Sequence, residues 1–269
     1  MDRGIRAQLA ETARAMHQRG WVANHDGNAS ARLGPGRFLV TPTATSKADV
    51  DERRLVEVDG AGQPVGSGRA FGEIGLHLAV YAARADVAAV VHAHPPYATA
   101  LACSGSALLE RPFIAEAVVS LGPSIPTLPF AAPGKPAAEA LAAAAGDVDA
   151  VLVANHGALA WGATLEQAYL RLELVEHLAR IATLAQATGG IRALPDQAIG
   201  PLLEARARAK LGAAADRAVE LWRGGAPRPV VACAPAPHSP TPTIAPGRPA
   251  RADVAAVVRE ELLRALRER

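Results

Sequence analysis

Two hydrophobic periodicities alternate along the chain, and they predict an interleaved set of helices and strands. Helical spacing is clearest over 73–84, where Ile74, His77, Leu78 and Tyr81 recur on one face. Helical composition also marks residues 5–19, 136–145, 164–187 and 201–223, and strand-like apolar runs mark 27–32, 37–42, 55–60, 87–93 and 148–154. The order lacks a regular βαβ rhythm, and several adjacent strands can pair antiparallel. We therefore predict an α/β or α+β layered domain with a mixed sheet.

The pattern changes after residue 225, which predicts three parts in the chain. Residues 1–225 contain the helices and strands of the main domain. Prolines recur throughout 226–249, which favours an extended linker rather than helix or central strand. Residues 250–269 have apolar positions on one side and arginines opposite, as in an amphipathic helix. That helix either docks on the main domain or a neighbouring subunit, or forms a mobile tail.

Composition narrows the classes of partner and compartment. The 269 residues are 50% hydrophobic and 20% charged, with a net charge of +2, so neither a nucleic acid nor a membrane surface is expected as a partner. Cys103 and Cys233 form no motif and are expected to be reduced thiols. The N-terminus has no apolar signal core, and no apolar run is long enough to span a bilayer, so we expect a cytoplasmic protein.

Histidines end two of the predicted strands, and they are the strongest chemical signal in the sequence. His92 and His94 close the run 87–93, and side chains at i and i+2 on a strand share one face. His156 follows the run 148–154. Three imidazoles with an open position suit a catalytic zinc ion. The alternative is a set of buried structural histidines, which is less favoured because burying imidazoles without partners costs several kcal/mol.

Two further features have chemical and purely structural interpretations. Glu73 opens the helix 73–84, where it can serve as an acid/base group near a metal or simply favour the helix dipole. The sequence supports both equally. Small donors are concentrated in Gly27-Asn28 and in residues 41–47. Such loops cradle anions through backbone N–H groups and hydroxyls, and they are as often plain turns.

In combination, these motifs resemble the class II aldolase/adducin family, in particular its L-fuculose-phosphate aldolase-like branch. The matching elements lie in the family's order across roughly residues 5–190. They are Gly27-Asn28-Ala29-Ser30, Thr41-Pro42-Thr43, Glu73 with His77, His92-Ala93-His94 and Asn155-His156-Gly157. The resemblance implies a central, mostly antiparallel sheet flanked by helices, and a homotetramer. Residues 1–225 are accordingly expected to be the catalytic domain.

The resemblance also implies an activity and a role for each matching residue. His92, His94 and His156 correspond to the ligands of Zn²⁺, with Mn²⁺ or Co²⁺ as alternatives, and Glu73 corresponds to the catalytic acid/base. Gly27, Asn28, Thr43 and Ala44 correspond to positions that hold the substrate phosphate. The implied reaction is aldol cleavage or formation of a ketose or ketose phosphate. It proceeds through a zinc-stabilised enediolate and releases a dihydroxyacetone-type fragment and an aldehyde.

Three departures from the family pattern leave other functions open. Phe71-Gly72 stand where the family has a phosphate-binding Ser-Ser pair, Ala44 replaces a glycine, and Phe113 aligns with a tyrosine that polarises the aldehyde. A decarboxylase or dehydratase acting on a non-phosphorylated substrate is the alternative enzyme. A non-catalytic, adducin-like interaction module ranks last, because adducin-like proteins lose the metal histidines and this chain keeps all three.

Overall fold

The computed structural model of the chain describes residues 2–132 and 134–223. These residues belong to one unit, spanning 1–234. The predicted linker 226–249 and the predicted C-terminal helix 250–269 lie outside the described residues. Within the described ranges, no helix combines the length and apolar character needed to cross a bilayer.

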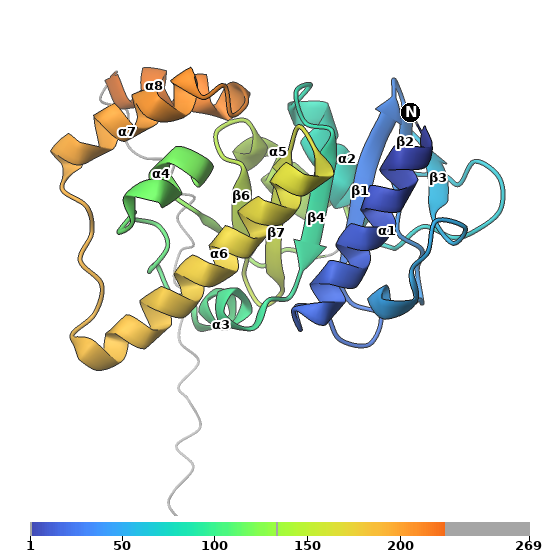
Figure 1. The fold of residues 1–269 in the computed structure, drawn as a ribbon, viewed down its shortest axis with the longest axis horizontal. Helices are drawn as coiled ribbons and strands as arrows, with labels where there is room; N and C mark the ends of the chain where they lie inside the picture. Colours follow the sequence, from blue (N-terminus) through green and yellow to red (C-terminus); the bar gives the residue numbers. More distant parts are fainter. Residues whose placement is uncertain (1, 133, 224–269) are drawn as a thin grey trace, which may run out of the picture. The chain divides into compact units, whose positions relative to one another are not determined.

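A single sheet forms the centre of the described unit (Figure 1). The strand order is β3-β2-β1-β4-β7-β6-β5, and each neighbouring pair is antiparallel except β5 with β6. The mostly antiparallel sheet that the family resemblance implied is therefore confirmed. The strands are β1 Asn28–Gly34, β2 Arg37–Val40, β3 Val56–Asp59, β4 Ala89–Ala93, β5 Thr127–Leu128, β6 Ala150–Val153 and β7 Gly157–Gly162.

Helices cover both faces of this sheet. One apolar core lies between the sheet and the helices α1, α3, α4 and α6, and a second lies between the opposite face and α2 and α5 (Figure 1). The helices are α1 Asp2–Gln18, α2 Ile74–Ala83, α3 Pro96–Ser104, α4 Ala115–Leu121, α5 Lys135–Ala145, α6 Leu165–Ala185, α7 Asp196–Arg208 and α8 Ala213–Arg223, with short 3₁₀ turns at Lys47–Asp49 and Gln186–Thr188.

Strand alternation decides which face each side chain of β4 reaches. Val91 packs in the first core and Val90 in the second, as expected for a period of two. His92 has the same parity as Val90, so it belongs to the face that α2 covers. On the neighbouring strand β1, Asn28 is the register partner of His92 and Ser30 that of Val90. The polar residues of β1 and β4 are therefore brought under the N-terminal half of α2.

The predicted helix over 201–223 is wrong in its extent. The structure has two helices, α7 and α8, separated by a break in which Lys210 has φ 53° and Gly212 has φ 108°. Left-handed backbone cannot continue an α-helix, so the chain turns there. Helix α3 was also missed. It starts directly after the second histidine of the pair, at Pro96, a residue suited to the first turn because its missing N–H needs no partner there.

A buried ionic cluster joins distant segments at one end of the sheet. Asp149, fully buried just before β6, pairs with three buried arginines. Arg84 ends α2, Arg171 lies on α6, and Arg206 lies on α7, and each contributes a guanidinium to the same carboxylate. Asp86 also binds Arg84 through two hydrogen bonds, of 2.7 and 2.8 Å.

Replacing Asp149 by asparagine is expected to destabilise the protein by about 3 kcal/mol, because three guanidiniums would remain buried with too little negative charge. Urea denaturation of the wild-type and variant proteins measures this difference. Asp216→Asn, an exposed position on α8, is the matched control. Equal stabilities of wild type and Asp149→Asn would mean that this cluster contributes nothing net.

Candidate functional site

The end of strand β4 and the turn between β6 and β7 bring the three histidines to one place. His92 is the fourth residue of β4, His94 follows the end of that strand, and His156 lies in the tight turn between β6 and β7. In that turn Asn155 has φ 57°, a left-handed conformation that asparagine tolerates better than most residues. A Cβ on Gly157 would lie 2.5 Å from the Ala93 carbonyl oxygen and 2.6 Å from His94 Cδ2, so only glycine permits this approach.

The three imidazoles converge. One ligand atom of each histidine lies within 4.8 Å of the corresponding atoms of the other two. The His92 and His156 rings are stacked, with centroids 4.7 Å apart, and the His94 ring meets both edge-on at 5.1 and 5.0 Å. The structure thus brings together the three residues that the sequence singled out as a metal-binding set.

Two ring nitrogens, His92 Nε2 and His156 Nε2, face each other inside the cluster at 2.9 Å. His92 Nδ1–H donates to the Ala158 carbonyl oxygen at 3.0 Å, which directs His92 Nε2 into the cluster. His94 Nδ1 lies 3.6 Å from the Asp26 carboxylate, and its Nε2 is buried without a hydrogen-bond partner in the part of the chain that the structure describes. Buried polar atoms normally have partners, and metal-binding histidines are normally oriented by their second nitrogen. These residues therefore fit a divalent cation.

Glu73 closes the cluster from the helix above it. It is the N-cap residue of α2, and its two carboxylate oxygens lie 2.9 Å from His156 Nε2 and 3.5 Å from His92 Nε2. Asn28 Nδ2 donates to the same carboxylate at 2.9 Å. The glutamate side chain is one-third exposed, so it can reach a molecule bound against the histidines. Its position distinguishes it from a glutamate that only favours the helix dipole.

The three histidines and Glu73 differ in how their surroundings shift their pKa values. Burial lowers the pKa of His92 to about 4 and also lowers that of His94, so both are neutral at pH 7. The hydrogen bond to Glu73 raises the pKa of His156. Burial opposes ionisation of Glu73, but hydrogen bonds from His156 and Asn28 outweigh it and hold the pKa of that carboxyl well below its usual range. Because His92 is neutral above pH 4, its charge matters little to Glu73 at pH 7.

Of the residues expected to hold a phosphate, Asn28 has a hydrogen bond to the cluster, and the others are described by their local geometry. Asn28 is in direct contact with Glu73. Gly27 has φ 67°, and a Cβ there would meet Val22 Cγ1 at 2.4 Å, which accounts for the glycine through packing alone. Thr43 and Ala44 lie in the loop after β2, where the Thr43 N–H donates to the Arg69 carbonyl. Ala44 keeps a left-handed φ of 51° although it is not a glycine.

The departures from the family pattern differ in their structural consequences. Phe71 turns inward and packs in the core beside the His77 ring, 4.9 Å between centroids. Gly72 is exposed, and a Cβ there would have no atom within 4 Å. Phe113 is half-buried against the core under α3, α4 and α6.

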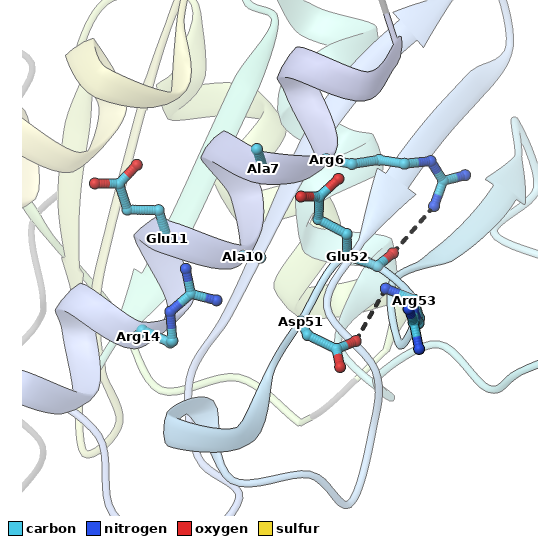
Figure 2. A pocket seen from close by; sticks show the side chains of 8 residues that line it. All are labelled: Arg6, Ala7, Ala10, Glu11, Arg14, Asp51, Glu52 and Arg53. Carbon is cyan, nitrogen blue, oxygen red and sulfur yellow. Dashed lines mark hydrogen bonds between the residues drawn. The ribbon is translucent and has the colours of Figure 1, made fainter.

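A hollow with a volume of about 1040 Å³ lies between α1 and residues 51–53, and the three histidines do not line it (Figure 2). Figure 2 shows Arg6, Arg14 and Arg53 together with Glu11, Asp51 and Glu52 around it. Three cations and three anions leave no net charge to select a ligand. None of the candidate site residues lines this hollow.

Sequence reasoning missed several polar residues around the cluster. His77 lies one helical turn beyond Glu73, but its imidazole bonds to Asn28 and Ser30. The helical spacing that put His77 and Tyr81 on one face was the available signal. Asp26 lies in a loop and had no such signal.

Comparisons with known proteins agree with this geometry. Residues 7–183 match the family model for the Class II Aldolase and Adducin N-terminal domain. A 3-oxo-tetronate 4-phosphate decarboxylase of Escherichia coli is 33% identical over 185 residues, covering 67% of this chain and 87% of that protein. An L-fuculose phosphate aldolase of E. coli is 32% identical over 202 residues, covering 73% and 91%.

A solved structure shares the fold as well. The crystal structure of YgbL from E. coli superposes with a TM-score of 0.69 at 32% identity, covering 74% of this chain and 97% of that one. The matched region contains the histidine cluster and Glu73, and the family match spans well over half of the chain. The chain therefore belongs to the class II aldolase and adducin family.

Proposed function

We propose that this protein is a metal-dependent lyase that breaks or makes a carbon–carbon bond next to a carbonyl group, and that decarboxylation of a 3-oxo sugar acid is its reaction. The observation that carries the proposal is the convergence of three imidazoles and the Glu73 carboxylate on one point. Aldol cleavage is the second candidate, supported by similarity to an L-fuculose phosphate aldolase. Decarboxylation comes first because Phe113, aligned with the aldolase tyrosine, has no proton to give to an aldehyde.

The cation would be held by His92, His94 and His156, and three imidazoles with an open position favour Zn²⁺. When bound, the ion supplies Lewis acidity, which stabilises negative charge on oxygen as the carbon–carbon bond breaks. Asp26 lies where it orients the His94 ring.

In this proposal Glu73 transfers the proton. Loss of carbon dioxide from a 3-oxo acid leaves the bonding electron pair on the remaining fragment as an enolate, whose carbon then takes up one proton. Glu73 is ionised at neutral pH, and it takes a proton from solvent and delivers it to that carbon. In the aldol alternative the same carboxylate exchanges the proton of the enediolate carbon.

The test is product analysis with the zinc-loaded protein. Under this proposal 3-oxo-tetronate 4-phosphate releases carbon dioxide, and L-fuculose 1-phosphate yields little dihydroxyacetone phosphate. The reverse pattern would replace decarboxylation by aldol cleavage. Release of neither product would overturn the proposed function. The homotetramer implied by the family resemblance and the cytoplasmic location expected from the sequence stay predictions.

Substrate phosphate recognition is tested by Gly72→Ser. A serine fits there without collision. Its hydroxyl, by donating a hydrogen bond to the substrate phosphate, should strengthen substrate binding by about 1.5 kcal/mol, which lowers KM for the phosphorylated substrate roughly tenfold. Restoring both serines is a poorer test, because Phe71 belongs to the core and its loss would destabilise the protein.

Gly75→Ser is the matched control for this experiment, since Gly75 is equally open and lies three residues further on, in the first turn of α2. An unchanged KM for the phosphorylated substrate in Gly72→Ser would mean that the substrate phosphate binds elsewhere.

A further inference from the structure

A continuous chain of buried hydrogen bonds extends from Glu73 into the protein. Asn28 Nδ2 bonds to the Glu73 carboxylate at 2.9 Å, and Asn28 Oδ1 lies 2.6 Å from His77 Nε2. His77 Nδ1 lies 2.7 Å from Ser30 Oγ, which is 2.8 Å from the Tyr81 hydroxyl. Each of these four hydrogen bonds joins strand β1 to helix α2 or to Glu73 at its N-cap. His77 and Ser30 are fully buried, and Asn28 and Tyr81 nearly so.

The carboxylate at one end determines the direction of every bond. Ionised Glu73 can only accept, so the Asn28 amide must present its NH₂ group to it and its carbonyl oxygen to His77. His77 must then carry its proton on Nε2, and its Nδ1 must accept from the Ser30 hydroxyl. Ser30 Oγ in turn accepts from the Tyr81 hydroxyl. Burial lowers the pKa of His77 to about 3, which agrees with a neutral ring.

Asn28, in the middle of this hydrogen-bond chain, limits the chain to an orienting role. An amide does not readily pass a proton from one side to the other, so the chain cannot carry protons between His77 and Glu73. It can fix orientation, because each member has only one arrangement that satisfies its neighbours. Aromatic rings enclose it, with Phe71 tilted against His77 and Phe38 stacked on Tyr81 at 4.6 Å.

We propose that His77 is a positioning residue that holds the Asn28 amide in one orientation and thereby directs the Glu73 carboxylate toward the three imidazoles. Without the donor at His77 Nε2, the amide can rotate and place its oxygen against the carboxylate. Glu73 would then move out of reach of the reacting carbon. This inference rests on the proposed function only in its kinetic consequence, since the orientation itself is a property of the protein alone.

Two substitutions of His77 separate positioning from packing. Glutamine places an N–H near the position of Nε2 and preserves the bond to Asn28, whereas asparagine places its polar atoms near Nδ1 and reaches only Ser30. We expect His77→Asn to lower kcat on the order of 30-fold, because it removes a group that orients the catalytic carboxylate. KM should stay within about threefold of the wild-type value, and the metal content should be unchanged. His77→Gln should retain kcat within about fivefold.

Equal losses of kcat in both variants, or a loss carried mainly by KM, would overturn the positioning role. His17→Asn and His17→Gln, at an exposed site at the end of α1, are the matched controls.

A second measurement does not depend on any activity. In ¹⁵N-histidine-labelled, metal-free protein, the His77 resonances are assigned as those lost in His77→Gln. Their ¹⁵N shifts should report a protonated Nε2 and an unprotonated Nδ1 from pH 5 to 8, and Ser30→Ala should move the Nδ1 resonance. A proton on Nδ1 would refute the proposed orientation even if the enzyme is active. The expected tautomer in a protein that releases neither product would refute the proposed function and keep the orientation.

Discussion

Alanine in place of His94 is expected to remove the bound metal and to lower turnover on the order of 10³-fold or more, while the fold persists. Two imidazoles cannot hold a divalent ion as three do, and the Lewis acidity is lost with the ion. Of the three histidines, His94 suits this test because it follows the end of β4 and its side chain is 29% exposed. His92 is fully buried in the strand, so its removal would also leave a cavity.

The measurements are metal per chain after zinc loading and dialysis, kcat for carbon dioxide release, and thermal unfolding by circular dichroism. His17→Ala, which removes an exposed imidazole, should keep both metal and turnover. If His94→Ala retained one ion per chain and full turnover, the metal site would have to lie elsewhere.

Glutamine in place of Glu73 is expected to lower kcat by about 10³-fold while the metal stays bound, because general acid–base catalysis contributes on that order. The substitution keeps the shape of the side chain and an oxygen that accepts from Asn28 Nδ2. It removes the ability to hold and release a proton, together with the negative charge beside His156. The result would therefore separate proton transfer from metal binding, whereas His94→Ala removes the metal and the turnover at the same time.

The comparison requires kcat, KM and metal content for each variant. Glu166→Gln, in the exposed first turn of α6, is the control for loss of one carboxylate. Loss of the metal in Glu73→Gln would make Glu73 a ligand rather than the acid/base, and full turnover would assign the proton transfer to another group.

The elements that sequence reasoning recovered are those whose signal is local. Periodicity marked α2, helical composition marked α6, and apolar runs marked β4 and β6, and each of these signals lies within the element itself. The break between α7 and α8 was missed because a left-handed residue such as Lys210 leaves no compositional trace. Short elements such as α3 give too few periods to recognise.

In the candidate site, too, the residues with a local sequence signal were predicted and those without one were not. The spacing of His92 and His94 and the pairing of apolar strands with terminal histidines were enough to predict a three-imidazole cluster, because the two-residue period of a strand determines which side chains share a face. The role of His77 could not be derived from such local spacing. Its partners Asn28 and Ser30 lie 49 and 47 residues away, and no local pattern encodes that distance.

The sequence by itself determined the family and, through the family resemblance, the mostly antiparallel layered fold, and it predicted the three histidines and Glu73 as the chemical centre. Only the tertiary structure decided that Phe71 faces the core, that Gly72 is open, and that Asn28 is held between Glu73 and His77. The reason is physical: periodicity reports the burial of one side chain against an average environment, whereas a hydrogen-bond partner depends on how β1, β4 and α2 are packed together.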